Sequence, residues 1–197
     1  MSYPLREEAI DRFIQLFRRA EQEKVPEHTA MTLATVRADG RPAARIVLLK
    51  DVDHRGFVFY TNQRSRKGQD LAVTPAAALC FYWPPLASQV LVEGDVVPVS
   101  AAEADAYFAS RPRLSQIGAW ASEQSRPLHD RQQLEQRVAD FERQFAEGPI
   151  PRPPDWSGYR VIPRLMEFWY AGDGRLHERE RYELPLDGPG RHYLVNP

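Results

Sequence analysis

Cysteine is almost absent from this sequence, since Cys80 is the single one among 197 residues. One cysteine excludes an internal disulfide framework and any zinc site that needs several cysteines. Cys80 stands within the apolar run AAALCFYW. That context predicts a small buried thiol rather than a nucleophile.

Long apolar runs are also missing, because none is long enough to span a bilayer. The first residues, MSYPLREEAIDRF, do not contain the apolar centre of a signal peptide. Together these two features predict a cytoplasmic protein.

The sequence lacks the short motifs of several common enzyme classes. It contains no GxxxxGK(S/T) loop and no GxSxG elbow, and GDGRLH at 172–177 lacks the third glycine of a dinucleotide fingerprint. No His, Asp and Glu residues have the spacing of a zincin or an EF-hand. A hydrolase or a metalloenzyme therefore has little support, and we expect no metal site.

A strong overall charge is absent as well, since the formal net charge is -1. No general field attracts nucleic acid or an anionic membrane, so any anion site must be built locally. Of the 26 basic residues only three are lysine, and two of these, Lys50 and Lys67, lie in the basic stretches described below.

Apolar residues at helical spacing predict a first amphipathic helix over about residues 5–23 and another between Leu134 and Phe145. Ser100 and Glu103 have the spacing of a capping box, which predicts a short helix over AAEADAYFAS.

Strand-like runs dominate the rest of the chain. MTLATV and PAARIVLLK predict a hairpin that turns at Asp39-Gly40, and a second turn, DHRG, leads into FVFYT. AAALCFYW and QVLVEGDVVPV follow, and GYRVI, LMEFWYA and the region from Arg175 to Tyr182 end the series. Because strands follow strands, we expect a β-barrel or strongly curved sheet with helices, not a Rossmann fold.

Four basic stretches are the candidates for a functional site. In the first, Arg45 and Lys50 flank an apolar strand, and simple alternation places them on opposite faces. One ligand could use both only through a bulge or a site shared between subunits. The alternative is a pair of solvent-facing strand ends.

The second stretch runs from Tyr60 to Gly68, where a strand ends and a helix begins near Ser65. Backbone N–H groups at a helix start, beside Arg66 and Lys67, are suited to hold a phosphate. An ordinary charged helix start is the alternative.

The third stretch is RPRLSQIGAWASEQS, residues 111–125. Tyr107 and Arg111 are four residues apart and can share a helical face, and Ser115 follows the break at Pro112. A phenol, a guanidinium and a hydroxyl together suit a phosphate monoester. The alternative is a solvated loop that leads into a short helix.

The fourth stretch follows Trp169. If it is a strand, Arg175, His177 and Arg179 lie on one face, where stacked cations repel one another unless an anion covers them. An exposed edge strand is the alternative.

The chain resembles the pyridoxine/pyridoxamine 5′-phosphate oxidases, which are FMN-dependent enzymes of the flavin split-barrel fold. The matching segments, in family order between about residues 30 and 182, are ARIVLLK, FVFYTNQRSRKG, QVLVEGD, YFASRPRLSQIGAWASEQS, WSGYRV and EFWYAGDGRLHER. The resemblance implies a mainly β domain with helices over residues 1–197. Its parts are the N-terminal helix, a helical insertion at about 100–147 and C-terminal strands at about 157–195.

The resemblance also implies roles for individual residues. The implied FMN contacts are Arg45, Ile46, Val47, Leu48, Leu49, Lys50, Tyr60, Thr61, Arg66, Lys67, Gln89, Gln124, Ser125, Trp169 and Arg179. The implied contacts to the substrate phosphate are Lys50, Tyr107, Arg111 and Ser115. Arg175 and His177 would position the pyridine ring against the flavin, and the IGAW segment would be a turn between the phosphate and flavin contacts.

The implied reaction is oxidation of pyridoxine or pyridoxamine 5′-phosphate at C4′, with hydride transfer to the flavin and reoxidation by O2 to H2O2. The product would be pyridoxal 5′-phosphate. A homodimer is implied, in which two subunits build each FMN site, and this would bring Arg45 and Lys50 to one ligand.

Two departures from the family pattern bear on the substrate. Family members commonly carry a basic, tyrosine-containing segment before the first helix, whereas this chain begins almost at that helix. The tail is RHYLVNP, where the family tends to end in Arg-Leu-x-Pro. Two alternatives therefore remain: a related FMN oxidase acting on another aromatic substrate such as a phenazine precursor, and a non-catalytic protein that binds FMN or pyridoxal phosphate.

Overall fold

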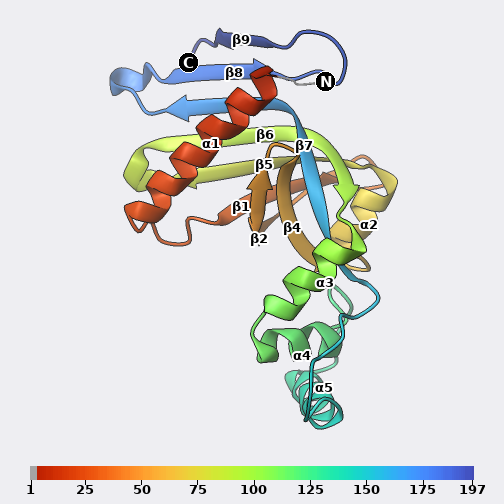
Figure 1. Ribbon diagram of the computed structural model, residues 1–197. Coiled ribbons are helices and arrows are strands. Elements are labelled where there is room, and N and C mark those ends of the chain that lie inside the picture. The colour runs from red at the N-terminus through yellow and green to blue at the C-terminus, as the bar shows by residue number, and fades with distance from the viewer. Residues whose placement is uncertain (1–3) are drawn as a thin grey trace.

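A computed structural model describes residues 4–197 of the protein, and in these residues nine strands form one antiparallel sheet (Figure 1). The strands are β1 (Ala30–Val36), β2 (Pro42–Leu48), β3 (Asp51–Asp53), β4 (Gly56–Asn62), β5 (Ala76–Trp83), β6 (Ser88–Pro98), β7 (Trp156–Tyr170), β8 (Glu178–Glu183) and β9 (Arg191–Leu194). The helices are α1 (Pro4–Gln22), α2 (Arg66–Val73), α3 (Ala101–Ser110), α4 (Arg113–Ala121) and α5 (Arg131–Gln144), with short 3-10 turns η1 (Pro84–Leu86) and η2 (Asp173–Arg175). The prediction of a mainly β fold with helices is confirmed.

The long strand β7 gives the sheet its split form. One side of β7 pairs with β6 over nearly its full length. The other side pairs with β4 in the first half and with β8 in the second half. Strand β7 therefore connects two ends of the molecule, one near α3 and one near η2 (Figure 1).

The prediction of two separate strands, GYRVI and LMEFWYA, was wrong, because β7 runs through both. Pro163 has no N–H to donate and pairs with Gly94, where the register between β6 and β7 shifts. A Cβ at Gly94 would lie 2.1 Å from the carbonyl oxygen of Ile162, so only glycine fits there. This bulge bends the strand without ending it.

Several local signals are confirmed by the structure. β1 and β2 form a hairpin that turns through Asp39 and Gly40, and Gly40 has a positive φ of 79°. The side chain of Ser100 accepts a hydrogen bond from the backbone of Glu103, whose carboxylate bonds back to the Ser100 backbone. Ser65 caps α2 by accepting from the N–H of Gly68.

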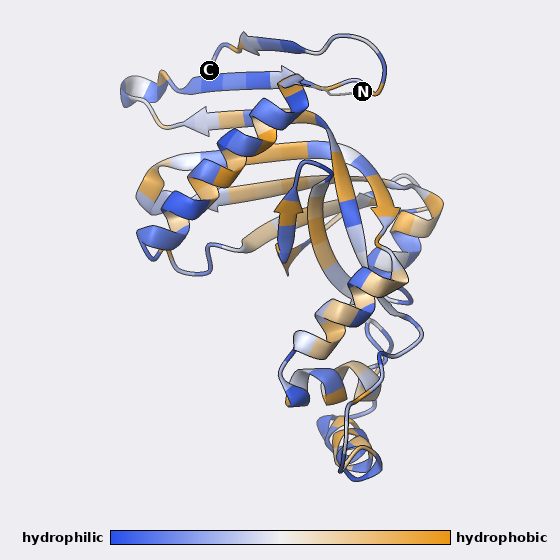
Figure 2. Ribbon diagram, viewed as in Figure 1, coloured by the Kyte–Doolittle hydropathy of each residue, from blue (hydrophilic) through white to orange (hydrophobic). Residues whose placement is uncertain are grey.

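The main core lies between α1 and the concave face of the sheet, where apolar residues gather (Figure 2). Phe13 of α1 packs against Phe57, Phe81 and Trp83, with ring centroids 4.8 to 6.0 Å apart. In the described residues no helix is long and apolar enough to cross a membrane.

A network of polar side chains fastens α1 to β8. Arg12 donates to both oxygens of Glu180, and His192 lies 3.1 Å from the same carboxylate. The Arg12 guanidinium is the main cause that lowers the pKa of Glu180 to about 2.

This network predicts that the free energy of unfolding decreases at acidic pH. Because the folded-state pKa of Glu180 is depressed from 4.5, its carboxylate stabilises the fold above pH 4.5, and this stabilisation is lost as the pH falls toward 2. Arg12→Met is expected to lower the free energy of unfolding at pH 7 by roughly 1–3 kcal/mol. It should also reduce the loss of stability between pH 4.5 and 2, as urea denaturation at several pH values would measure. An equally large loss of stability between pH 4.5 and 2 in the variant would contradict this role of the Arg12–Glu180 pair.

Candidate functional site

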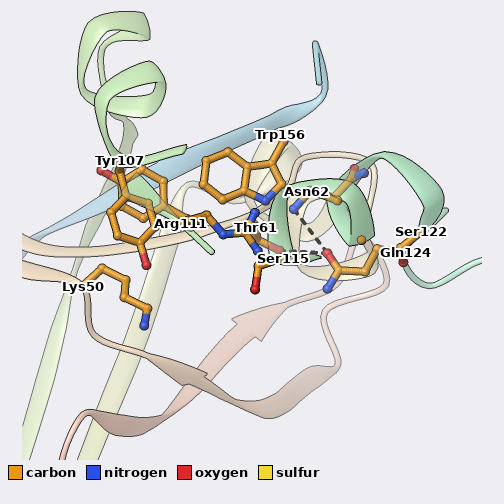
Figure 3. Close-up of a pocket in the computed structure, with 12 residues that line it drawn as sticks. Lys50, Thr61, Asn62, Tyr107, Arg111, Ser115, Ser122, Gln124 and Trp156 are labelled. Carbon is orange, nitrogen blue, oxygen red and sulfur yellow. Dashed lines mark hydrogen bonds between the residues drawn. The ribbon is translucent and has the colours of Figure 1, made fainter. Parts of the chain in front are cut away.

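A cavity of about 420 Å³ opens where β4, α3, α4 and the first residues of β7 meet (Figure 3). The structure brings all four candidates for the substrate-phosphate pocket to its walls: Lys50, Tyr107, Arg111 and Ser115. The other lining residues are Tyr60, Thr61, Asn62, Gly118, Ala119, Ser122, Gln124 and Trp156. The walls thus carry two cations, several hydroxyl and amide groups, and three aromatic rings.

Lys50 reaches the cavity because β2 ends at Leu48. The backbone N–H of Lys50 then donates to the carbonyl of Val58 on β4, 2.9 Å away. Lys50 therefore lies beyond the strand, and within one chain it and Arg45 do not meet at one place. Arg45 does not line the cavity, and its guanidinium donates to the Thr35 hydroxyl at 2.7 Å.

Arg111 follows α3 and is a half-buried cation with aromatic neighbours. Its Cζ lies 4.8 Å from the ring centroid of Trp156 and 5.6 Å from that of Phe108. Its Nη1 atom is buried without a hydrogen-bond partner, and no carboxylate lies within ion-pair distance of Arg111 among residues 4–197. Burial lowers the pKa of Arg111. A buried donor without a partner is costly, so this atom is suited to meet an anionic ligand.

Residues 113–121 form the helix α4, so the prediction that IGAW is a turn was wrong. Ile117 and Ala121 are buried on one side of α4, whereas Ser115 and Gly118 line the cavity. After the helix ends, the side-chain oxygen Oε1 of Gln124 accepts from the Thr61 hydroxyl at 3.1 Å and from the backbone N–H of Asn62 at 3.2 Å. Figure 3 shows the bond between Gln124 and Asn62.

A cluster of cations lies beside the cavity at the start of α2. Lys67 is only 8% exposed, and its Nζ donates to the hydroxyls of Thr61, at 3.0 Å, and Ser65, at 3.3 Å. No carboxylate pairs with Lys67 within the described part of the chain. Burial, and then the charge of Arg45, lower the pKa of Lys67. Arg66 is exposed on the same helix turn.

Gly68 follows Lys67 for a steric reason. A Cβ at this position would lie 2.2 Å from the backbone oxygen of Gln63. The first turn of α2 therefore packs directly against the loop that precedes it. This contact places the Lys67 ammonium next to Thr61, which also lines the cavity.

Four implied FMN contacts lie in β2, which is at the edge of the sheet, or directly after it. Ile46 and Leu48 point outward and are 64% and 37% exposed. Val47 packs against the core, and Leu49 is buried. None of these four residues lines the cavity.

A third group of candidates gathers at the other end of β7. Gln89 pairs with Trp169, which in turn pairs with Arg179. The rings of Trp169 and His177 have centroids 4.6 Å apart, and the Gly172 N–H donates to Nδ1 of His177 at 3.2 Å. Arg179 forms an ion pair with Glu167 at 2.9 Å.

Arg175 is not in a strand, so the prediction that it shares a strand face with His177 and Arg179 was wrong. It ends the turn η2 with a positive φ of 64°, and β8 begins only at Glu178. Arg175 is exposed and follows Gly174, which also has a positive φ.

The two ends of β7 are far apart in one chain. Trp156 at the cavity and Trp169 in the third group are separated by about 13 residues of strand, which corresponds to roughly 40 Å when extended. A single chain therefore brings the cavity residues and the cations at the start of α2 together, but not the third group. Ser125, with a positive φ of 69°, follows Gln124 but does not itself line the cavity.

Sequence reasoning missed several lining residues, among them Trp156, Asn62 and Ser122. Trp156 ends the proline-rich segment GPIPRPPDW, and a lone tryptophan after such a connector was an available but unused signal. Asn62 and Ser122 lie within stretches that were singled out, but neither residue carried a signal of its own.

Comparison with known families gives two matches along the chain. Residues 17–145 match the family described as pyridoxamine 5′-phosphate oxidase. Residues 156–194 match the pyridoxine 5′-phosphate oxidase C-terminal dimerisation region.

Curated relatives match over nearly the whole chain. A pyridoxine/pyridoxamine 5′-phosphate oxidase from Alkalilimnicola ehrlichii is 57% identical over 195 residues, which cover 98% of this chain and 99% of the relative. A protein of the same name from Myxococcus xanthus is 57% identical over 188 residues, covering 95% of this chain and 91% of the relative.

Solved structures share the fold. PhzG from Burkholderia lata 383, crystallised with tetrahydrophenazine-1-carboxylic acid, has a TM-score of 0.91 at 32% identity. The match covers 100% of this chain and 98% of the PhzG chain. An FMN-binding protein from Nostoc punctiforme, described as related to pyridoxamine 5′-phosphate oxidase, has a TM-score of 0.73 at 18% identity, with 93% and 95% covered.

Proposed function

The chain belongs to the pyridoxine/pyridoxamine 5′-phosphate oxidase family, and from this premise we propose that it is an FMN-dependent oxidase that forms pyridoxal 5′-phosphate. Its substrates would be pyridoxine 5′-phosphate, pyridoxamine 5′-phosphate or both. The predicted split-barrel fold, homodimer and FMN cofactor agree with the family and its structural neighbours. One domain over residues 1–197 and a cytoplasmic location are part of the proposal.

The observation that carries the proposal is the unpaired cation in the cavity. Arg111 presents a buried donor without a partner, and Lys50, Tyr107 and Ser115 line the same space. A phosphate monoester carries nearly two negative charges and several acceptor oxygens, which these side chains can bind together. In this assignment the cavity holds the substrate phosphate.

The residues around α2 fit the phosphate of FMN. Lys67 is a nearly buried ammonium whose described partners are two neutral hydroxyls, and Arg66 adds positive charge nearby, whereas the charge of Arg45 is paired with Asp70 at 3.6 Å. A dianionic phosphate would balance this excess of charge. Thr61 joins this cluster to the cavity, so flavin and substrate would be neighbours.

We further propose that each site uses two subunits. Gln89, Trp169, Arg175, His177 and Arg179 lie too far from the cavity of their own chain to reach one ligand with it. The matched dimerisation region, residues 156–194, contains all of them except Gln89. The edge strand β2 also exposes apolar side chains, as a dimer interface would need.

Bound FMN would supply the redox chemistry of the proposed oxidation at C4′, as the hydride acceptor and as the carrier of electrons to O2. The protein binds the two phosphates and orients the rings. His177 accepts a hydrogen bond at Nδ1, so its neutral form carries the proton at Nε2 and can donate a hydrogen bond to the substrate from there. Arg175 and His177 are therefore assigned to orientation and electrostatics.

Peroxide release in air by the FMN-loaded protein tests the proposal. Turnover with pyridoxine 5′-phosphate or pyridoxamine 5′-phosphate, tested separately, is the expected result. Binding of both compounds without peroxide would instead indicate a carrier. Failure to bind either would contradict the phosphate pocket.

The second candidate is suggested by the fold neighbour PhzG, which was crystallised with an unphosphorylated aromatic acid. Such a ligand would leave the cations of this cavity without a phosphate to pair with. Tetrahydrophenazine-1-carboxylic acid is therefore the comparison substrate, and turnover with it alone would favour this candidate.

A further inference from the structure

We propose that Trp156 is a positioning residue that sets the specificity for phosphorylated substrates by holding the Arg111 guanidinium through a cation–π contact. The inference rests on the proposed role of the cavity as the phosphate pocket. It adds to that role a residue that touches the cation rather than the phosphate itself.

Most other partly or fully buried arginines in the described chain pair with carboxylates. Arg160 pairs with Asp53 and Glu103, each at 2.8 Å, and Arg179 pairs with Glu167. A carboxylate partner orients a guanidinium but also neutralises its charge. Arg160 and Arg179 therefore illustrate the usual way in which this protein compensates such a cation.

Arg111 is held differently. Its described neighbours are the rings of Trp156, at 4.8 Å, and Phe108, at 5.6 Å. An aromatic face attracts a cation through its quadrupole without adding net negative charge, and tryptophan does so best. The guanidinium is thus oriented while its full charge and its Nη1 donor remain available to a ligand.

Trp156 is fixed through both its backbone and its ring. Its backbone N–H donates to the Pro153 carbonyl at 3.0 Å, and its own carbonyl accepts from Nη1 of Arg152 at 2.6 Å. The ring stacks on Tyr60 with centroids 5.3 Å apart and planes within 6°. Tyr60 stacks in turn on Tyr107 at 4.1 Å.

This stack connects the two tyrosine rings with the Arg111 guanidinium, and all of these residues line the cavity. The Trp156 ring is nearly parallel to the rings of Tyr60 and Tyr107 and also contacts the Arg111 guanidinium. Figure 3 shows the side chains of Trp156, Tyr107 and Arg111 at the cavity. A change at Trp156 should therefore weaken binding of the phosphate more than binding of the rest of the substrate.

The test compares the dissociation constants of pyridoxal 5′-phosphate and pyridoxal for the FMN-loaded dimer. The Kd of pyridoxal divided by the Kd of pyridoxal 5′-phosphate measures the contribution of the phosphate. Trp156→Leu, which removes the ring, should reduce this ratio roughly 10-fold, and Trp156→Phe, which keeps a weaker ring, should reduce it roughly 3-fold. The Phe variant keeps the test valid if the Leu variant does not fold.

Ile117→Ala is the matched control, because Ile117 is buried in the same small core as Trp156 and has no ring for Arg111. It should destabilise the protein and leave the ratio unchanged. An equal reduction of the ratio by Ile117→Ala would mean that Trp156 acts only through packing, and would overturn the inference.

The same Trp156 variants in an Arg111→Ala background distinguish the inferred role of Trp156 from the proposed phosphate pocket. If Trp156 acts through Arg111, they should have no further effect on the ratio there. A full effect in that background, or none in the wild type, would overturn the inference and leave the phosphate pocket standing. A normal ratio in Arg111→Ala alone would overturn the pocket itself.

Discussion

Arg175→Ala is expected to lower kcat/KM for pyridoxine 5′-phosphate by roughly 100-fold or more while the protein retains its FMN. Arg175 is exposed on the turn η2 and makes no ion pair in the described chain, so its loss should not disturb the fold. Its guanidinium would lose only contacts to the bound substrate. Peroxide release and the flavin absorbance per chain measure the two effects.

Leu176→Ala is the control for this turn, since Leu176 is the neighbouring residue and is 77% exposed. It removes a side chain of similar reach without removing charge. A loss of flavin from Arg175→Ala would contradict the assignment to the substrate. Equal losses of kcat/KM in both variants would show that the turn, rather than the guanidinium, matters.

Lys67→Met is expected to weaken FMN binding by roughly 10- to 100-fold, because it would remove the charge-assisted bond that we propose to the flavin phosphate. The methionine keeps most of the apolar stem in its nearly buried place. Arg66→Ala should have a smaller effect, roughly 3- to 10-fold, because Arg66 is exposed to solvent. Quenching of flavin fluorescence on binding gives the dissociation constants.

Riboflavin provides the control for the Lys67 prediction. It lacks the phosphate, so its affinity should be nearly the same in the wild type, Lys67→Met and Arg66→Ala. An equal loss of affinity for riboflavin and FMN would show that Lys67 supports the loop and not the phosphate.

Much of the fold could be predicted because local signals agree with the tertiary structure. The Asp39-Gly40 turn, the caps at Ser65 and Ser100 and the helical spacing of α1 all depend on neighbouring residues. The course of β7 could not be predicted in this way. A proline normally interrupts pairing, and only the opposite Gly94 makes the bulge at Pro163 acceptable.

The site was predictable where a motif is contiguous and less so where it depends on distant partners. Arg111 and Ser115 were found as a charged stretch, but nothing local indicates that Trp156, 45 residues later in the chain, holds Arg111. The strand argument placed Arg175 wrongly, because the positive φ at Gly174 and Arg175 turns the chain before β8 begins. The roles of these residues remain predictions.

Subunit mixing tests the central claim, that one catalytic site combines the cavity of one chain with Arg175 and His177 of another. Arg111→Ala and Arg175→Ala proteins, each nearly inactive alone, are unfolded together, refolded with FMN and assayed for peroxide release. Random pairing makes half of the dimers mixed, and each mixed dimer then contains one intact site, so about one quarter of the wild-type activity should return. If both residues served a site within one chain, no mixed dimer would have an intact site, and activity would stay at the level of the separate variants.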